Sequence, residues 1–570
     1  MAPSSGHTSV LISGGGLVGL SAALFLQYHG VGAVLVERRA RASVLPRSRG
    51  VHTRTVELLR QIGLERRVQH AAESALKMGA FGGARQGTTL LDATALDIGG
   101  PAGGGPAVGG PAGGGLGGGG AGHGGPGPSA RGRMTGSMDA SPSHFCFCPQ
   151  VLLEPVLTGA ALERGCDVRL GTELTGFTAD DDGITGTVTE LATGIPATLR
   201  AGYLIAADGA MSAVREALGI TSWTLEPTHH YLNLFVSADL ADLVAGRTFS
   251  QCDVANDTVR CLILSKNNTD EWSFHVEYDP ATESIEDYPE QRCVELVRAA
   301  IGADVDVKLL ARSAWDTGVR VADEYARGRV FLAGDAAHQH APWGGFGANT
   351  GIADAHNLAW KLAAVLAGHA DPALLDTYQP ERRPRAVLAA SQARLRTDFL
   401  ARYGVRTTSN AADIDRQLDS GAIMMRYRYE SPAVLGEGAG EDRVAALHGQ
   451  AGTRVPHAWL DVDWRRASTL DLCGPGFAIL ANSDAARWRA AAAGASTETG
   501  LSIAVHQIDP SAGLAEAGVT WPERTGLPGD GALLVRPDGH VAARSDGGLS
   551  PDTLVAVLRE ITAVAPVTGS

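Results

Sequence analysis

A glycine-rich loop between a short apolar strand and a helix is the feature that most constrains the fold. Residues 8–13 (TSVLIS) form an apolar run, and residues 14–19 (GGGLVG) match the pattern G-x-G-x-x-G. Residues 17–29 then place apolar side chains at helical spacing, and a second apolar run follows at residues 32–37 (GAVLVE). A β-α-β unit of about thirty residues with this loop predicts the start of a Rossmann-like sheet.

The loop has the chemistry of a dinucleotide site. Its glycines permit a tight turn and let a diphosphate approach the backbone, where the helix N-terminus offers free N–H groups. Glu37, at the end of the second strand, is placed to accept hydrogen bonds from a ribose. A purely structural turn is the alternative. The predicted diphosphate contacts are Gly14, Gly16, Leu17, Val18 and Gly19.

A second glycine loop, at residues 344–347 (GGFG), follows another predicted strand. Residues 328–335 (GRVFLAGD) read as a buried strand that ends in Asp335, and a long helix is expected to start at Asn349. A carboxylate at the end of a buried strand costs free energy unless hydroxyl groups pair with it. A helix N-terminus stabilises negative charge by roughly 0.3–1 kcal/mol, and by up to about 2 kcal/mol when partly buried. The two loops therefore suit opposite ends of one long ligand, such as a flavin nucleotide.

The order of the apolar runs predicts an α/β chain with an insertion. Residues from 222 to about 315 alternate in the manner of strands, and residues 328–335 return to a buried strand. We therefore expect the segments before and after this β-rich section to share one sheet. From about residue 445 the chain carries its own strands and a last helix, which indicates a separate small α/β domain. Residues 98–128 are almost pure Gly, Ala and Pro, and we expect a flexible surface insertion there rather than a lid.

Length and charge narrow the function classes. A chain of 570 residues favours two to four domains. Its net charge of −14 argues against binding to nucleic acid or to an anionic membrane, both of which need basic patches. The N-terminus has no basic stretch followed by an apolar one, so we expect a cytoplasmic protein.

The cysteines and histidines do not predict a metal or redox site. Seven cysteines are scattered, and Cys146 and Cys148 lack the two-residue spacing of a zinc or redox pair. His338 and His340 have no third ligand near them in sequence, so a structural hydrogen bond is the expected role of His338. No metal site is expected.

Several motifs in fixed order resemble one enzyme family. GGGLVGL, PRSRGVHTRTVELL, AADGAMSAVR, GRVFLAGDAAH and GGFGANTGIADAHNLAWKLA follow one another along the chain. In this the chain resembles the group A flavoprotein monooxygenases, which have the p-hydroxybenzoate hydroxylase fold. Within them it is most similar to the actinobacterial aromatic polyketide hydroxylases, such as the tetracenomycin and anthracycline ring oxygenases. The resemblance extends over nearly the whole chain.

The resemblance implies a Rossmann-like FAD-binding domain, an inserted β-sheet substrate domain and a C-terminal thioredoxin-like domain. The last of these lacks C-x-x-C, with Cys473 its only cysteine, and should be redox-silent. The implied division is residues 1–79, 147–220 and 316–400 for FAD, 80–146 and 221–315 for substrate, 401–444 as a helical linker, and 445–570 as the thioredoxin-like domain.

The resemblance also implies the contacts of the adenosine end and of the middle of FAD. Glu37 would bind the adenosine ribose, and Arg38 would lie beside the adenine. Arg47 matches an arginine on the loop near the flavin, with Arg49 a less certain neighbour. Gln150 matches a glutamine that contacts the ribityl chain.

The flavin end is implied in the same way. Asp208 would serve both FAD and the nicotinamide donor, and Asp335 would hold the ribityl hydroxyls. Relatives often have Gln or Met in the glycine loop, where this chain has Phe346 and Ala348, and this difference puts the substrate's shape beside the ring in doubt. Trp343 and Phe346 are expected to line the substrate, with plain packing an equal alternative for Trp343. The implied border of the isoalloxazine is Pro342 and the backbone of Gly347, Ala348 and Asn349.

The resemblance implies an FAD-dependent monooxygenase of antibiotic biosynthesis. NADPH or NADH would reduce the flavin, and O2 would form a C4a-hydroperoxide that hydroxylates a polycyclic aromatic polyketide. No catalytic acid or base is assigned. Baeyer–Villiger oxygen insertion, epoxidation and a non-catalytic flavin-binding regulator stay open. A halogenase is disfavoured because Trp272 and Trp315 stand outside any W-x-W-x-I-P pattern, and a plain NAD dehydrogenase leaves Asp335 without a role. The protein is expected to be a monomer or a homodimer.

Overall fold

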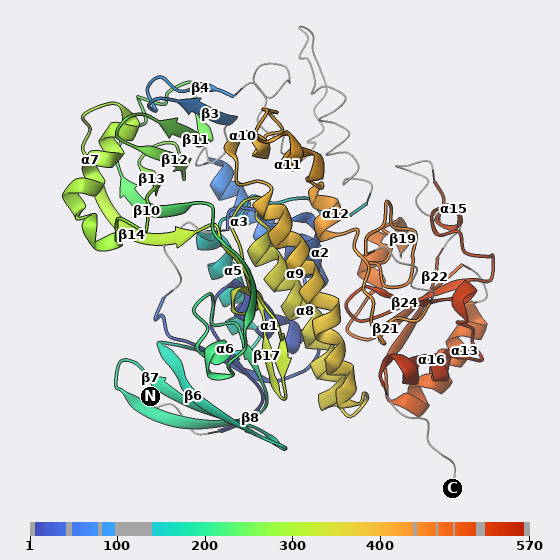
Figure 1. Cartoon of the computed structure of the whole chain (residues 1–570). Coiled ribbons are helices and arrows are strands. Elements are labelled where there is room, and N and C mark those ends of the chain that lie inside the picture. The colour runs from blue at the N-terminus through green and yellow to red at the C-terminus, as the bar shows by residue number, and fades with distance from the viewer. Residues whose placement is uncertain are drawn as a thin grey trace.

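The computed structural model describes most of the chain in three parts (Figure 1). A large sheet carries the N-terminal helices, a second sheet lies beside it, and the C-terminal domain packs against the long helices α8 and α9. The predicted insertion at 98–128 and Arg47 lie outside the described residues. These residues are 6–41, 48–77, 83–96, 140–436, 442–462, 465–482, 485–508 and 519–563.

The first sheet joins segments that lie far apart in the sequence. Strand β1 (Gly6–Ser13) pairs in parallel with β2 (Ala33–Glu37) on one side and with β8 (Ile195–Ala206) on the other. Strand β17 (Val330–Leu332) pairs in parallel with β8, which confirms that the segments before and after the β-rich section share one sheet. The remaining strands of this sheet are β5 (Asp167–Leu170), β6 (Thr172–Asp180), β7 (Gly183–Glu190) and β16 (Ala326–Arg327).

Helices cover this sheet because their apolar residues recur at helical spacing. Leu17, Leu20 and Leu24 of α1 (Leu17–Tyr28) are buried, and α1 packs against both α5 and α8. Helix α9 packs on α8 from the other side. None of the described helices is long and apolar enough to cross a bilayer. The helices are α2 (Thr53–Gln61), α3 (Glu65–Lys77), α5 (Gln150–Glu163), α6 (Ala213–Ala217), α8 (Phe346–Leu366) and α9 (Tyr378–Arg394).

Helix α8 begins at Phe346, three residues before the predicted start at Asn349. The difference arises at Gly345, which caps the helix with a left-handed φ of 68° that glycine adopts without a steric penalty. Gly347, Ala348 and Asn349 consequently lie inside the first turn, where helix N–H groups have no partner within the helix.

The second sheet has seven strands, and α7 (Glu290–Ile301) packs on one face. Alternate residues of β10, such as Leu232 and Leu234, share a core with α7, so Tyr231 and Phe235 face the other way. Strand β3 brings residues of the N-terminal part into this sheet by pairing in parallel with β11. In sheet order the strands are β14 (Lys308–Asp316), β10 (His230–Ser237), β13 (Glu271–Glu277), β12 (Arg260–Ser265), β11 (Phe249–Ala255), β3 (Gly83–Gly87) and β4 (Thr94–Ala95).

A small three-stranded sheet and three short helices complete the middle of the chain, and a fourth short helix lies in the C-terminal part. The strands are β18 (His338–Gln339), β15 (Val319–Ala322) and β9 (Ser222–Leu225), in that order. The helices are α10 (Phe399–Arg402), α11 (Ala411–Arg416) and α12 (Ser420–Met424), with α15 (Trp521–Thr525) farther along the chain.

The C-terminal part forms its own four-stranded sheet, which agrees with the predicted separate α/β domain. Strand β21 pairs in parallel with β22 and antiparallel with β23, and β24 forms the edge. Helices α13 and α16 pack beside each other (Figure 1). The elements are β19 (Trp459–Val462), β20 (Arg465–Ser468), β21 (Phe477–Ala481), α13 (Ala485–Thr499), β22 (Ile503–Gln507), β23 (Ala532–Val535), β24 (Val541–Arg544) and α16 (Leu554–Ile561).

Candidate active site

The first glycine loop is packed so tightly that Gly14, Gly15 and Gly19 admit no side chain. Gly14 has a φ of 104°, and a Cβ there would lie 2.2 Å from the carbonyl oxygen of Ala207. A Cβ on Gly19 would lie 1.9 Å from the carbonyl oxygen of Gly14. These glycines bring the turn against the end of β8 and let α1 start directly after β1.

Gly16 differs from Gly14 and Gly15 because a side chain at this position would extend into open space. A Cβ on Gly16 would meet no heavy atom within 4 Å. Gly16 is also the N-cap of α1, and no side chain among the described residues caps this helix, so the N–H groups of its first turn, which includes Leu17 and Val18, have no partner within the helix. This arrangement fits a diphosphate, which needs backbone N–H donors and room beside them.

Glu37 lies where a ribose-binding carboxylate is expected. It is buried, and its Oε2 accepts a hydrogen bond from the backbone N–H of Gly15 at 2.6 Å. Its Oε1 accepts from both the backbone N and the Nε of Arg39, each at 2.8 Å. Burial raises the pKa of Glu37, but the hydrogen bonds from Arg39 and Gly15 outweigh it, so the pKa lies below its usual value. Arg38, the predicted adenine neighbour, is exposed.

The turn that carries Asp335 touches the first glycine loop at Val18. Gly334 has a φ of 62°, and a Cβ there would lie 2.7 Å from Cγ2 of Val18. A Cβ on Gly351 of α8 would lie 2.6 Å from the same atom. The turn after β17 and helix α8, which begins at the second glycine loop, therefore lie against the first loop at the carboxyl ends of β1 and β17.

Asp335 departs from the sequence-based reasoning, because its side chain is exposed and not buried. The strand β17 ends at Leu332, and a short 3-10 turn over Gly334–Ala336 carries the carboxylate outward. The expectation that the Asp335 carboxylate is buried and therefore needs hydroxyl partners is wrong. A contact with ribityl hydroxyls remains a prediction, supported by the position of Asp335 next to Gly334.

Asp208 has one carboxylate oxygen committed and one available. Its Oδ2 accepts from the backbone N–H of Val214 at 3.2 Å. Its Oδ1 is buried and has no hydrogen-bond partner among the described residues. The backbone N of Asp208 lies 2.9 Å from the position that a Cβ on Gly14 would take. A buried acceptor beside the first loop fits a hydroxyl or amide donor on a ligand.

The start of α8 is held by Asn349. Its Oδ1 accepts from the backbone N–H of His52 at 2.8 Å, and its Nδ2 donates to the carbonyl oxygens of Gly50 and Gly345. This side chain is therefore committed to the scaffold, and a contact between the flavin and the backbone of Gly347, Ala348 and Asn349 remains a prediction.

The two predicted substrate-lining side chains separate in the structure. Phe346 stacks on His52, with ring centroids 5.5 Å apart, and packs into a cluster with Ala389 and Ala393 of α9. Its contacts are those of a scaffold residue. Trp343 instead packs with Tyr231 and other residues on the face of the seven-stranded sheet. Pro342 is exposed, and its carbonyl oxygen accepts from the N–H of Gly345.

The sheet face beside Trp343 carries several aromatic rings, and the guanidinium group of Arg402 lies over the ring of Trp343. Trp315 lies edge-on to Trp343 at 5.8 Å and stacks on Tyr231 at 4.7 Å between ring centroids. The Cζ of Arg402 lies 3.4 Å from the centroid of the Trp343 ring. Burial lowers the pKa of Arg402 to about 10, so it stays protonated at neutral pH. No sequence motif pointed to Arg402, which lies on the short helix α10.

Two polar residues sit among these rings. His275 accepts a hydrogen bond at Nδ1 from Nε1 of Trp315 at 3.1 Å, so its proton lies on Nε2. Burial, and then the nearby Arg402, lowers the pKa of His275 to about 3, so this imidazole is neutral. Asn233 stands opposite His275 in the β10–β13 register, and its Oδ1 is buried without a partner among the described residues.

The remaining predicted residues connect these parts. Gln150 starts α5 and donates from Nε2 to Glu154, whose Oε1 lies 3.7 Å from Nη2 of Arg39. Arg49 donates to the carbonyl oxygens of Ser250 and Ser265, which ties the loop after residue 48 to the seven-stranded sheet.

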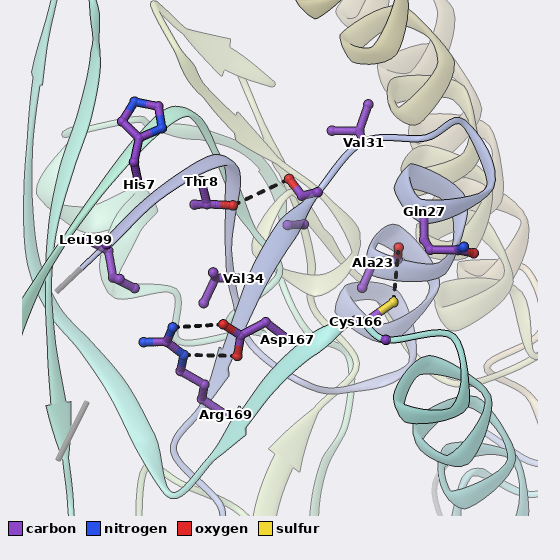
Figure 2. Close-up of a pocket in the computed structure, with 14 residues that line it drawn as sticks. His7, Thr8, Ala23, Gln27, Val31, Val34, Cys166, Asp167, Arg169 and Leu199 are labelled. Carbon is purple, nitrogen blue, oxygen red and sulfur yellow. Dashed lines mark hydrogen bonds and ion pairs between the residues drawn. The ribbon is translucent and has the colours of Figure 1, made fainter. Parts of the chain in front are cut away.

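A cavity of about 310 Å³ lies away from these loops (Figure 2). It is lined by the start of β1, including Thr8, and by Ala23, Gln27 and Cys166. Arg169 and Asp167 form an ion pair at its wall. This cavity is at the amino ends of the strands, opposite the glycine loops, so it does not belong to the site. Among the residues that the structure describes, no group of three His, Cys, Asp or Glu could hold a metal ion.

Comparison with known proteins assigns the two main parts of the chain. Residues 7–393 match the family described as FAD binding domain. Residues 448–565 match the family described as aromatic-ring hydroxylase, C-terminal. The chain belongs to the FAD-dependent aromatic-ring hydroxylases. It is therefore a flavin-dependent monooxygenase, and the family resemblance and the α/β fold expected from the sequence are confirmed.

Individual relatives match the hydroxylase over almost its full length. It is 40% identical over 556 residues to a tetracenomycin A2 monooxygenase-dioxygenase of Streptomyces glaucescens, covering 95% of this chain and 94% of that protein. It is 36% identical over 552 residues to a 4-methyl-5-nitrocatechol 5-monooxygenase of a Burkholderia species, covering 94% of each. The crystal structure of an aklavinone-11 hydroxylase in complex with FAD and aklavinone superposes with a TM-score of 0.80 at 32% identity, covering 98% of this hydroxylase and 99% of that chain.

Proposed function

We propose that this hydroxylase uses NADPH or NADH and O2 to add oxygen to a polycyclic aromatic polyketide in antibiotic biosynthesis. The observation that carries the proposal is the aromatic sheet face formed by Tyr231, Trp315 and Trp343, next to the start of α8. The names of the relatives support the substrate class, since one acts on tetracenomycin A2 and a similar structure holds aklavinone.

FAD would supply the redox chemistry when bound, reducing O2 to a species that transfers oxygen. Gly16 and the N–H groups of Leu17 and Val18 would hold its diphosphate, and Glu37 its ribose. Asp208 and Asp335 would take hydroxyl groups of the ligand, and the first turn of α8 would lie along the flavin edge. The chain's other task is to exclude water, and the buried rings beside Trp343 are suited to it.

The substrate would lie between the flavin edge and the sheet face. Flat rings stack favourably on Tyr231 and Trp315. The N–H at Nε2 of His275 and the free Oδ1 of Asn233 offer one donor and one acceptor side by side. These two groups would orient a substrate edge that carries a carbonyl next to a hydroxyl, a common arrangement in aromatic polyketides. Because His275 is neutral, it would donate a hydrogen bond and not act as a cationic acid.

A monocyclic phenol is the second candidate substrate. The 36% identity to a nitrocatechol monooxygenase favours it, because that relative is matched over nearly its full length. Product analysis distinguishes Baeyer–Villiger insertion and epoxidation from hydroxylation.

One experiment tests the proposal. The purified protein is examined for bound FAD, and NADPH and NADH oxidation is then followed in the presence of O2 with hydroxyanthraquinones, tetracyclic polyketides and nitrocatechols. We expect a polycyclic substrate to stimulate oxidation and to gain one or more oxygen atoms by mass. Stimulation only by monocyclic phenols would favour the second candidate. FAD binding without stimulation by any aromatic would leave a non-catalytic flavin protein.

A further inference from the structure

The C-terminal domain needs a role other than thiol chemistry. It contains one cysteine, Cys473, which is buried, so it cannot form a redox pair within itself. Its contacts with α8, which begins at the second glycine loop, and with α9 indicate a different role.

The domain shares an apolar core with α8. Trp360 of α8 packs edge-on against Phe477 of β21, with ring centroids 6.1 Å apart. Ile479 and Leu534 of the domain belong to the same buried cluster as Trp360 and Leu374. A continuous core of this kind joins the two parts as one packed unit, in contrast to domains connected only by a flexible linker.

Glu381 of α9 forms an ion pair with the C-terminal domain. Arg536 donates to both of its carboxylate oxygens, at 2.6 and 2.9 Å. Lys361 of α8 donates to Oε2 at 2.8 Å, and all three charged side chains are fully buried. Arg536 is also paired with Asp538 of the same domain. The pKa of Glu381 is low because the attraction of Arg536 and Lys361 exceeds the cost of burial.

The next residue of α9 points to the flavin loop. Arg382 donates from Nε to Oδ1 of Asp354 at 2.8 Å and from Nη2 to the carbonyl oxygen of Thr350. Oδ2 of Asp354 accepts from the backbone N–H of Gly334 at 3.2 Å and from Nε2 of His338 at 2.8 Å. Asp354 therefore fixes the turn that carries Asp335.

Tyr429 connects Arg382 to the C-terminal domain. Its Oη accepts from Nη1 of Arg382 at 2.9 Å. Its ring lies 4.3 Å from that of His540, and its backbone N–H donates to the carbonyl oxygen of Gly452.

We infer that the C-terminal domain positions the flavin-binding loop through two consecutive residues of α9. Glu381 forms an ion pair with Arg536 of the domain. Arg382, the next residue of α9, forms an ion pair with Asp354. Asp354 in turn accepts a hydrogen bond from the backbone N–H of Gly334, next to Asp335. Buried charges hold one geometry because a displaced charge finds no water to replace its partner. The inference rests on the proposed contact of Asp335 with FAD, and it assigns Glu381, Arg382, Asp354 and Tyr429 as positioning residues.

The test compares two variants with a control in the full-length protein. Tyr429→Phe removes the oxygen to which Arg382 donates, and Glu381→Gln removes the charge that Arg536 and Lys361 share. The control is Arg487→Ala, which breaks an exposed ion pair with Asp552 in the same domain. The FAD Kd and the unfolding temperature are measured on each apoprotein, by flavin fluorescence and thermal unfolding. The flavin midpoint potential is measured on each FAD-loaded protein by reductive titration.

We expect Tyr429→Phe to raise the FAD Kd about three- to tenfold, as the loss of one net hydrogen bond predicts. Glu381→Gln should raise it further, both variants should shift the midpoint potential, and Arg487→Ala should leave Kd and potential unchanged. Wild-type Kd and potential in Tyr429→Phe and Glu381→Gln would overturn the inference, and Tyr429→Phe decides alone if Glu381→Gln does not fold. Asp335→Ala separates the two proposals, because wild-type FAD affinity in that variant would refute the assignment of the loop itself.

Discussion

Replacing Gly16 with Ala tests whether the open space at the first loop is the diphosphate site. The backbone of Gly16 has φ −77° and ψ −171°, an extended conformation that alanine adopts freely. A Cβ there would meet no protein atom within 4 Å. As an N-cap, alanine is poorer than glycine by less than about 1 kcal/mol, so the apoprotein should fold with little loss of stability.

FAD affinity should respond much more strongly. The new methyl group would occupy the space through which the diphosphate approaches Leu17 and Val18. A helix N-terminus stabilises a partly buried anion by up to about 2 kcal/mol, and a hydrogen bond to a charged group contributes about 1.5–3 kcal/mol. Losing good contact with one such donor thus costs about 2–4 kcal/mol, which corresponds to an FAD Kd about 30- to 1000-fold higher.

The assay is an FAD titration of the apoprotein followed by flavin fluorescence, with the unfolding temperature of the apoprotein measured in parallel. Gly176→Ala in β6 is the matched control. A Cβ at Gly176 would also meet no atom within 4 Å, and Gly176 is far from the loop in the sequence. Gly19→Ala provides the opposite contrast, because its Cβ would lie 1.9 Å from the carbonyl oxygen of Gly14 and should destabilise the fold itself. An FAD Kd for Gly16→Ala within threefold of wild type would refute this reasoning.

Four further changes have definite expected outcomes. Asp335→Ala should raise the FAD Kd at least about tenfold through lost charge-assisted hydrogen bonds, and a variant that purifies fully yellow would contradict the contact. Trp343→Ala should raise substrate KM up to about tenfold and increase hydrogen peroxide formed per NAD(P)H while FAD affinity stays constant, because the ring packs against Arg402 and Trp315. The apoprotein should lose stability as pH falls from about 6.5 toward 4, because His275, His340 and His457 have pKa values of about 3, 4 and 3 in the fold and the unfolded chain binds protons first. Chemical unfolding at several pH values measures this slope, and His457→Gln should flatten it; an unchanged slope would remove His457 as a contributor. Deleting residues 103–125, which lie outside the described residues, should leave solubility and the unfolding temperature unchanged, and aggregation on gel filtration would show that the segment packs.

Local patterns were enough to predict the parts of the site that depend on backbone geometry. The loop at residues 14–19, the carboxylate of Glu37 and the turn at Asp208 follow strands that the sequence shows directly. Glycine positions are informative because packing at Gly14 and Gly19 leaves no room for a Cβ. The shared sheet of β8 and β17 could also be predicted, because both strands end in an apolar run that turn residues follow.

Other features were decided by contacts between residues far apart in the chain. The exposure of Asp335 depends on a turn held from α8 by Asp354, and the start of that helix depends on the left-handed Gly345. The pairing of His275 with Trp315 and its place opposite Asn233 follow from strand register, which alternation alone does not determine.

From the sequence alone one could predict two glycine loops suited to a dinucleotide-like ligand and membership of a flavin-dependent family. Only the tertiary structure placed Val18 between Gly334 and Gly351, and only it placed Arg536 against Glu381. The physical reason is that a turn is specified by its own few residues. A buried contact, in contrast, is specified by the packing of whole elements, whose relative positions no local pattern contains.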